Sequence, residues 1–186
     1  MKKVPTLFNR DFANNPRFVT QELNPAAQWV VDGEGVATRK YDGTCCAITN
    51  GVFYRRHEVK PGGVEPYGFM LADHDETTGK KQGWVEVGNG NEDKWHREAY
   101  AKLESKTDGT FELLGPKVQG NPENYTEHTL VRHSDAEVLD APRDFDGLKE
   151  YLRDKEIEGI VWHHPDGRMV KIKRRDFDFT TLEAKK

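Results

Sequence analysis

The strongest local conformational signal in this chain is the dipeptide Asn50-Gly51, which separates two short segments, 44–49 and 52–56. A type I′ turn needs positive φ at both central positions, and Asn followed by Gly meets that need best. The flanking segments are rich in β-branched, small and aromatic residues, which favour strands. The sequence therefore predicts a β-hairpin here, with antiparallel strands as a main part of the fold.

The rest of the chain is expected to mix strands with two helices. The expected strands are 29–31, 36–40, 110–114, 129–132, 137–139, 157–163 and 168–173. Amphipathic helices are expected over 92–105 and over 145–155, the second capped by Asp144. The segment through Asn24 shows no sustained period and is expected to be irregular. The segment 60–90, rich in glycine, is expected to be a long loop or a ragged hairpin.

Length and composition indicate a globular protein of one domain. A chain of 186 residues is long enough for one well-buried core, so a single domain over 1–186 is expected, as a monomer. The net charge of −4 argues against a protein that coats nucleic acid non-specifically. No apolar run approaches the roughly 20 residues that span a bilayer. No membrane segment is therefore expected. The only two cysteines are adjacent, a spacing that suits neither a structural disulfide nor a zinc site and favours a reducing cytoplasm.

Lys40 begins a K-x-D-G motif, Lys40-Tyr41-Asp42-Gly43. A lysine between a strand and an Asp-Gly turn is held on rigid backbone, as a nucleophilic amine requires. The motif occurs a second time at 106–109, so K-x-D-G alone does not decide which lysine is the nucleophile.

The last expected strand carries Lys171 and Lys173 on one face, because side chains alternate along a strand. Two lysines on one face repel each other unless an anion lies between them, and a phosphate is the natural candidate. The alternative, a solvated edge strand, stays open. Glu158, in the strand across the hairpin, is either exposed to solvent or paired with a cation in a site.

Five motifs follow one another in the order K-x-D-G, Arg55, 111–115, 158–161 and 171–173. This order resembles that of the covalent nucleotidyltransferases, which include ATP-dependent DNA ligases, RNA ligases and mRNA capping enzymes. The stretches 37–46 and 112–122 most resemble the small RNA ligase family typified by the vertebrate 5′-to-3′ RNA ligase. The resemblance runs from about Leu7 to Phe177.

The resemblance implies an α+β nucleotidyltransferase (adenylyltransferase) domain of two antiparallel sheets flanked by helices, with no separate OB-fold because no room remains after Lys173. It implies an ATP-dependent RNA ligase active in RNA repair, with Mg²⁺ or Mn²⁺ as metal. The enzyme would join the 5′-phosphate and 3′-hydroxyl ends of RNA through a lysyl-AMP and an adenylylated 5′ end.

By the same resemblance, the catalytic residues would be Lys40, Glu158, Lys171 and Lys173. Lys40 would attack the α-phosphate of ATP and carry AMP. Glu158 would help to hold Mg²⁺ or orient Lys40, and Lys171 and Lys173 would contact the α-phosphate.

Four further residues would bind the nucleotide or the RNA end. Asp42 and Gly43 would shape the turn beside the amine, and Glu112 would bind the ribose hydroxyls. Arg55 would hold either the ribose or the incoming 5′-phosphate.

The motif order also distinguishes the two K-x-D-G copies. Lys106 lies only six residues before Glu112, whereas Lys40 lies 72 residues before it and is followed by Arg55. The segment 106–109 is therefore predicted to be a turn that leads into the Glu112 strand. Two alternatives stay open: an ATP-dependent DNA nick ligase, and a module that binds nucleotides or RNA ends without turnover.

Overall fold

The computed structural model describes residues 1–180, whose contacts divide into two compact units. Unit 1 comprises Met1–Lys3 and Asp42–Asp135, and unit 2 comprises Val4–Tyr41 and the chain from Ala136 onward. Each unit has its own cluster of buried apolar residues. The single domain over 1–186 stays a prediction, because compact units of this size occur within one domain as well as in separate domains.

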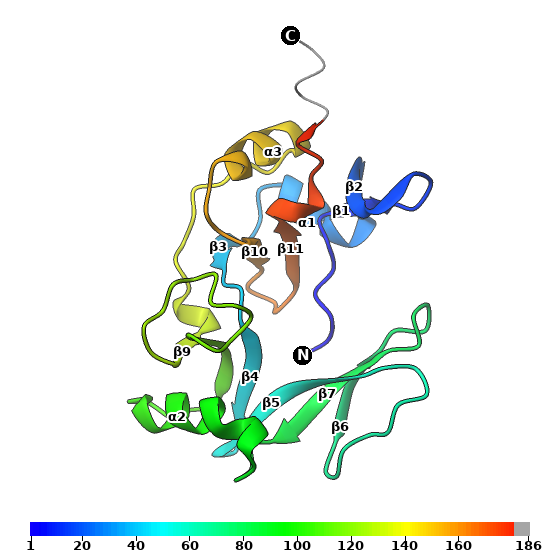
Figure 1. The fold of residues 1–186 in the computed structure, drawn as a ribbon. Coiled ribbons are helices and arrows are strands. Elements are labelled where there is room, and N and C mark those ends of the chain that lie inside the picture. The colour runs from blue at the N-terminus through cyan, green and yellow to red at the C-terminus, as the bar shows by residue number, and fades with distance from the viewer. Residues whose placement is uncertain (181–186) are drawn as a thin grey trace. The chain divides into compact units, whose positions relative to one another are not determined.

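Unit 1 is built on a six-stranded sheet in the order β6-β7-β5-β4-β8-β9, with every pair antiparallel (Figure 1). The strands are β4 (Thr44–Thr49), β5 (Val52–Val59), β6 (Met70–His74), β7 (Lys81–Glu86), β8 (Gly109–Leu114) and β9 (Thr129–Arg132). Asn50 and Gly51 have φ of 51° and 76°, so the predicted hairpin between β4 and β5 is confirmed.

Helix α2 (Lys94–Lys102) covers one face of this sheet, as the amphipathic pattern predicted, although it is shorter than expected. Ala99, 1% exposed, packs in one cluster with Cys46, Phe53 and Phe111 of the central strands. This face therefore forms the core of unit 1.

Unit 2 contains a three-stranded antiparallel sheet in the order β11-β10-β3 and a two-stranded sheet, β1-β2. The strands are β1 (Phe8–Asp11), β2 (Asn15–Leu23), β3 (Val36–Lys40), β10 (Gly159–His163) and β11 (Met169–Lys173). Two helices, α1 (Gln28–Val31) and α3 (Phe145–Arg153), complete the unit. The predicted cap of α3 is confirmed, since the Asp144 carboxylate accepts a hydrogen bond from Gly147 N at 2.9 Å.

The fold class is thus α+β with antiparallel sheets and few helices, as expected, but residues 1–180 form three sheets rather than two. The segment through Asn24 was wrongly expected to be irregular. It contains the β1–β2 hairpin, which the sequence concealed because β2 is largely exposed and its pairing with β1 is interrupted by register shifts. The segment 60–90 contains the hairpin β6–β7, the second of the two forms expected there.

Two shorter strand predictions were also wrong. Residues 29–31 belong to α1, because Asn24 caps the preceding 3-10 helix (Pro25–Ala27) through Ala26 N and the helical backbone continues from there. The segment 137–139 forms no strand of its own. It is bonded to β3 through Arg39 N to Glu137 O at 2.8 Å and Leu139 N to Ala37 O at 2.9 Å, and this pairing stays limited to the isolated bridge Thr38↔Val138.

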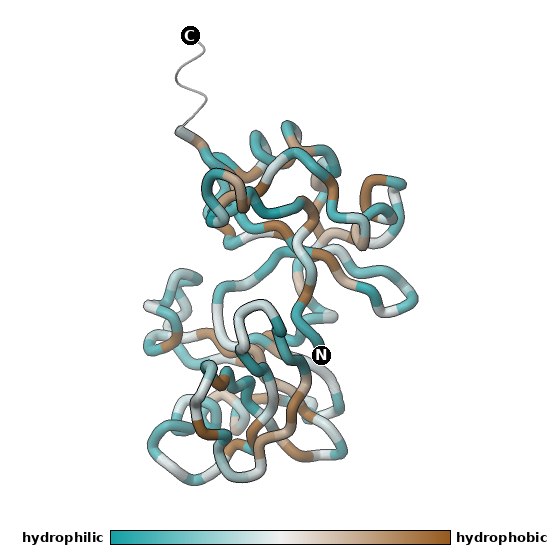
Figure 2. The backbone as a smooth tube through the Cα atoms, turned by 90° about the vertical axis from the view of Figure 1, so that its right-hand side faces the viewer, coloured by the Kyte–Doolittle hydropathy of each residue, from teal (hydrophilic) through white to brown (hydrophobic). Residues whose placement is uncertain are grey.

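The backbone coloured by hydropathy shows short apolar stretches set in a largely polar chain (Figure 2). Within residues 1–180, no helix is both long and apolar enough to cross a membrane. The cytoplasmic location and the monomeric state stay predictions.

Candidate active site

The end of β3 carries Lys40 in unit 2. In the three-stranded sheet Gly159 of β10 pairs with Lys40 on one side and with Lys173 on the other. A side chain at Gly159 could not be accommodated, because its Cβ would lie 2.1 Å from the carbonyl oxygen of Ile172. Backbone pairing alone therefore brings the two lysines to the same end of the sheet.

Glu158 immediately precedes β10 and joins these lysines. Its Oε2 lies 2.7 Å from Lys40 Nζ and its Oε1 lies 2.8 Å from Lys173 Nζ. The Glu158 side chain is only 10% exposed. Burial by itself would raise the pKa of the Glu158 carboxyl, but the two lysines outweigh burial and hold this pKa below its usual value. The carboxylate is therefore ionised at neutral pH and fixes both amines.

Lys171 lies two residues before Lys173 on β11. The buried residues of this strand are Val170 and Ile172, so the predicted alternation is confirmed and both lysines project from the opposite face. The main chain of Lys173 is held by Asp176, whose Oδ2 accepts a hydrogen bond from Lys173 N at 2.8 Å.

The turn after Lys40 belongs to unit 1 and is held by two carboxylates. Glu123 Oε1 accepts a hydrogen bond from Asp42 N at 2.9 Å, and Glu112 Oε1 accepts one from Gly43 N at 3.2 Å. Gly43 leaves no room for a side chain, since a Cβ would lie 2.2 Å from Leu113 O. The glycine of K-x-D-G is thus required by the close approach of β8.

Glu112 is held on its other oxygen as well. Its Oε2 lies 2.9 Å from His133 Nε2, and His133 Nδ1 lies 2.9 Å from Thr110 Oγ1. Glu112 is buried, 9% exposed. The residue predicted to bind ribose is therefore preorganised, and a hydroxyl group would have to share its oxygens with Gly43 N and His133.

Arg55 lies on β5 and forms an ion pair, with Nε 2.6 Å from Asp93 Oδ1. The Asp93 side chain is 3% exposed, so the pair is largely removed from water. Arg55 pairs across the sheet with Cys46, whereas Glu112 pairs with Cys45. Because neighbouring residues on a strand project from opposite faces, Arg55 and Glu112 start from opposite faces of the sheet.

The second K-x-D-G copy, at 106–109, connects α2 to β8 as predicted. Lys106 Nζ donates a hydrogen bond to Leu103 O at 2.7 Å, and the Asp108 carboxylate accepts hydrogen bonds from Asn50 N and Gly51 N. These residues hold backbone turns together.

Sequence reasoning missed three carboxylate or imidazole partners: Asp93, Glu123 and His133. Asp93 directly precedes α2 and so has the position of a capping residue, although its side chain makes no cap hydrogen bond to that helix. Glu123 follows a turn, and no periodicity distinguishes His133. Each contacts a residue more than 20 positions away in the sequence, and only the tertiary structure brings the two side chains or backbone groups together.

The donor set around Glu158 suits a metal that arrives with phosphates. Among residues 1–180, no three His, Cys, Asp or Glu side chains cluster as a metal cage. Mg²⁺, however, is commonly held by one or two carboxylates together with substrate phosphates and water. Each carboxylate oxygen has two lone pairs, so Glu158 can accept a further ligand beside its lysines.

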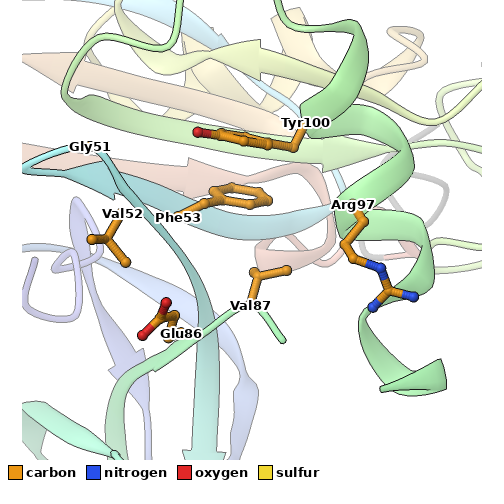
Figure 3. A pocket seen from close by; sticks show the side chains of 7 residues that line it. All are labelled: Gly51, Val52, Phe53, Glu86, Val87, Arg97 and Tyr100. Atoms are coloured by element: carbon orange, nitrogen blue, oxygen red, sulfur yellow. The ribbon is translucent and has the colours of Figure 1, made fainter. Parts of the chain in front are cut away.

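Unit 1 also contains an open pocket of about 410 Å³ where β5 begins and β7 ends (Figure 3). Phe53 and Tyr100 stack there with ring centroids 4.7 Å apart and an interplanar angle of 13°, and Arg97 lies at one side. The Arg97 guanidinium already donates to the carbonyls of Gly88 and Gly90. None of the predicted site residues lines this pocket.

Comparison with known proteins places these features in context. Residues 88–183, just over half of the chain, match the model of a family described as RNA ligase 1. RNA ligase 1 of Danio rerio is 26% identical, with 93% of this chain and 79% of that protein aligned. RNA ligase 1 of Mus musculus is 24% identical, over 75% of this chain and 65% of that protein. RNA ligase 1 of Rattus norvegicus is 36% identical over a shorter stretch, 35% of this chain and 23% of that protein.

Proposed function

The chain belongs to the RNA ligase 1 family, in agreement with the resemblance of its motifs, and we propose that it is an ATP-dependent RNA ligase that uses Lys40 as its nucleophile. It would join a 5′-phosphate to a 3′-hydroxyl of RNA. The observation that supports this assignment is the convergence of Lys40, Glu158 and Lys173 at one end of the three-stranded sheet.

In the first step Lys40 Nζ attacks the α-phosphorus of ATP. An N–P bond forms, the bond to the bridging oxygen breaks, and pyrophosphate leaves. Attack needs an amine that has lost its ammonium proton, which would pass to water, and Glu158 Oε2, at 2.7 Å, would orient the lysine nitrogen. Lys173 and Lys171 would stabilise the negative charge on the phosphate oxygens. Mg²⁺, bound with the phosphates at Glu158, would supply further positive charge.

In the second step an oxygen of the RNA 5′-phosphate attacks the phosphorus of lysyl-AMP. The N–P bond breaks, the lysine nitrogen takes back a proton, and the RNA carries an adenylylated 5′ end. In the third step the 3′-hydroxyl attacks the 5′-phosphorus of that RNA, a phosphodiester forms and AMP leaves.

The unit 1 residues have supporting roles in this proposal. Glu112 would accept hydrogen bonds from the ribose hydroxyls, and Asp42 and Gly43 would set the path of the chain directly after the nucleophile. Arg55 is the arginine that motif order assigns to the ribose or the 5′-phosphate.

Labelling with α-phosphate-labelled ATP and Mg²⁺ on a denaturing gel tests the first step. We expect the label to remain on the wild type, to be lost in Lys40→Ala and to persist in Lys106→Ala. The Lys106 variant is the matched control, because it removes the same side chain from the second copy of the motif. Absence of label on the wild type, or retention of label in Lys40→Ala, would refute the mechanism.

A substrate panel then tests the polynucleotide. Single strands and nicked duplexes of RNA and DNA, each with a 5′-phosphate, are compared for sealing. We expect RNA to be joined faster than DNA. Preferential sealing of nicked DNA would identify a DNA ligase, and labelling without sealing of any strand would identify a module that stops at adenylylation.

A further inference from the structure

Two adjacent arginines on β5 project from opposite faces of the six-stranded sheet. Arg55 pairs with Cys46, which in turn pairs with Phe111, so Arg55 starts from the face that α2 covers. Side chains alternate along a strand, so Arg56 starts from the other face. That second face carries Cys45 and Glu112, which are paired directly across β4 and β8.

The environment of Arg55 is that of a structural residue. Its Nε contacts Asp93 Oδ1 at 2.6 Å, and the second oxygen of Asp93 accepts a hydrogen bond from Gly88 N at 2.7 Å. The Nη1 of Arg55 lies 3.2 Å from His57 Nδ1. This guanidinium therefore ties β5 to the start of α2.

Arg56 is held differently, on an aromatic ring and by neutral groups. Its Cζ lies 4.9 Å from the centroid of the Trp84 ring, and the two residues are paired across β5 and β7. Its Nη1 donates to Met1 O at 2.7 Å and its Nε to Gln82 Oε1 at 3.4 Å. Within residues 1–180, no carboxylate oxygen lies within 4.0 Å of this guanidinium.

Arg56 is thus a half-buried cation that is oriented but not neutralised. Burial lowers the pKa of Arg56, while the carboxylate charge of Asp73 acts in the opposite direction. Asp73 itself accepts a hydrogen bond from Lys3 N at 3.0 Å. A planar guanidinium that is stacked on an aromatic ring and keeps N–H groups available is suited to bind a phosphate.

We propose that Arg56, supported by Trp84, binds a phosphate group on the face of the sheet that carries Glu112. This inference rests on the proposed ligase function for the identity of the ligand, which is a phosphate of ATP or the 5′-phosphate of the RNA. It assigns to Arg56 the contact that motif order gives to Arg55.

Two measurements on Arg56→Ala distinguish the two sources of phosphate. The first is the rate of lysyl-AMP labelling with ATP and no RNA. The second is the Kd, by fluorescence anisotropy without ATP, of one single-stranded RNA with a 5′-phosphate or a 5′-hydroxyl. Loss of a hydrogen bond to a charged group predicts a change of about 10- to 100-fold in one of them. Slower labelling identifies ATP, and loss of the preference for the 5′-phosphate identifies the RNA end.

Three variants serve as comparisons. Lys80→Ala removes an exposed lysine that pairs with Glu58, and we expect it to match the wild type in both measurements. Arg56→Lys keeps the charge without the planar fork and should show an intermediate loss. Arg55→Ala should mainly lower the Tm, since it leaves Asp93 buried without its cation.

The inference is overturned if folded Arg56→Ala, or folded Arg56→Lys should the alanine variant not fold, keeps both the labelling rate and the preference for the 5′-phosphate. Because RNA binding is measured without ATP, it remains informative even if the wild type forms no lysyl-AMP. Absence of lysyl-AMP on the wild type would refute the proposed function but would leave the phosphate site at Arg56 to be judged by RNA binding.

Discussion

Glu158→Gln is the substitution whose effect the structure predicts most directly. It removes one negative charge that lies 2.7 Å from Lys40 Nζ and 2.8 Å from Lys173 Nζ. At an effective dielectric constant of about 20, each contact corresponds to about 6 kcal/mol of attraction before desolvation is subtracted. Measured hydrogen bonds to charged groups retain about 1.5–3 kcal/mol each.

The two lysine side chains are 21% and 15% exposed, so water will partly solvate them in the variant. We therefore expect the free energy of unfolding at pH 7 to fall by about 2–4 kcal/mol. The measurement is urea denaturation followed by tryptophan fluorescence and circular dichroism. Glu150→Gln is the matched control: Glu150 lies 3.0 Å from Arg153 but is 70% exposed, so its loss should change stability by less than about 1 kcal/mol.

The pH dependence gives a second test of Glu158. Its pKa is lowered in the folded state from the usual value of 4.5, so the unfolded state takes up the proton first as pH falls. The stabilisation is present above about pH 4.5 and is lost as pH falls through the folded-state pKa. The difference between wild type and Glu158→Gln should therefore shrink below about pH 4.5. Equal stability at pH 7, or a difference that does not change with pH, would refute this account.

Three further predictions concern packing and titration. Gly159→Ala should lower the free energy of unfolding by more than about 2 kcal/mol and slow lysyl-AMP formation, because its Cβ would collide with the β11 backbone; urea denaturation showing normal stability would contradict the packing. Burial raises the pKa of the Cys46 thiol, so in Cys45→Ser this remaining thiol should resist a thiol reagent at pH 8 until urea unfolds the protein, and rapid labelling of the folded variant would contradict this. Burial lowers the pKa of His96, so the stability that this residue contributes is present above about pH 6.5 and is lost progressively as pH falls below that value. His96→Phe should therefore flatten this part of the curve of unfolding free energy against pH. An unchanged curve would exclude His96 as the source of the dependence.

Local sequence signals predicted those elements whose pattern is complete within a few residues. The Asn50-Gly51 turn was predicted by backbone requirements alone, and the cap at Asp144 by side-chain chemistry. The hairpin of β10 and β11 followed from alternation about the turn before Arg168. Two of the failures, at 8–23 and 29–31, lie where exposure hides the alternation or where a preceding cap decides between strand and helix.

The candidate site, too, was predicted in part from the sequence and in part determined only by the tertiary structure. Motif order in the sequence was sufficient to prefer Lys40 to Lys106 and to select Glu158 and Lys173 as its companions. Only the tertiary structure placed Gly159 between the two lysines and gave both oxygens of Glu158 a partner. Residue types and order are properties of the chain, whereas distances between residues more than 100 positions apart are set by strand pairing.

The adjacent arginines show the limit of sequence reasoning most clearly. The sequence determined that two cations follow the hairpin at positions 55 and 56, and the strand period determined that they point in opposite directions. Which face α2 covers was decided by packing, and with it which arginine is tied to Asp93 and which rests on Trp84. A strand has two equivalent faces until another element buries one of them, so that choice belongs to the tertiary structure alone.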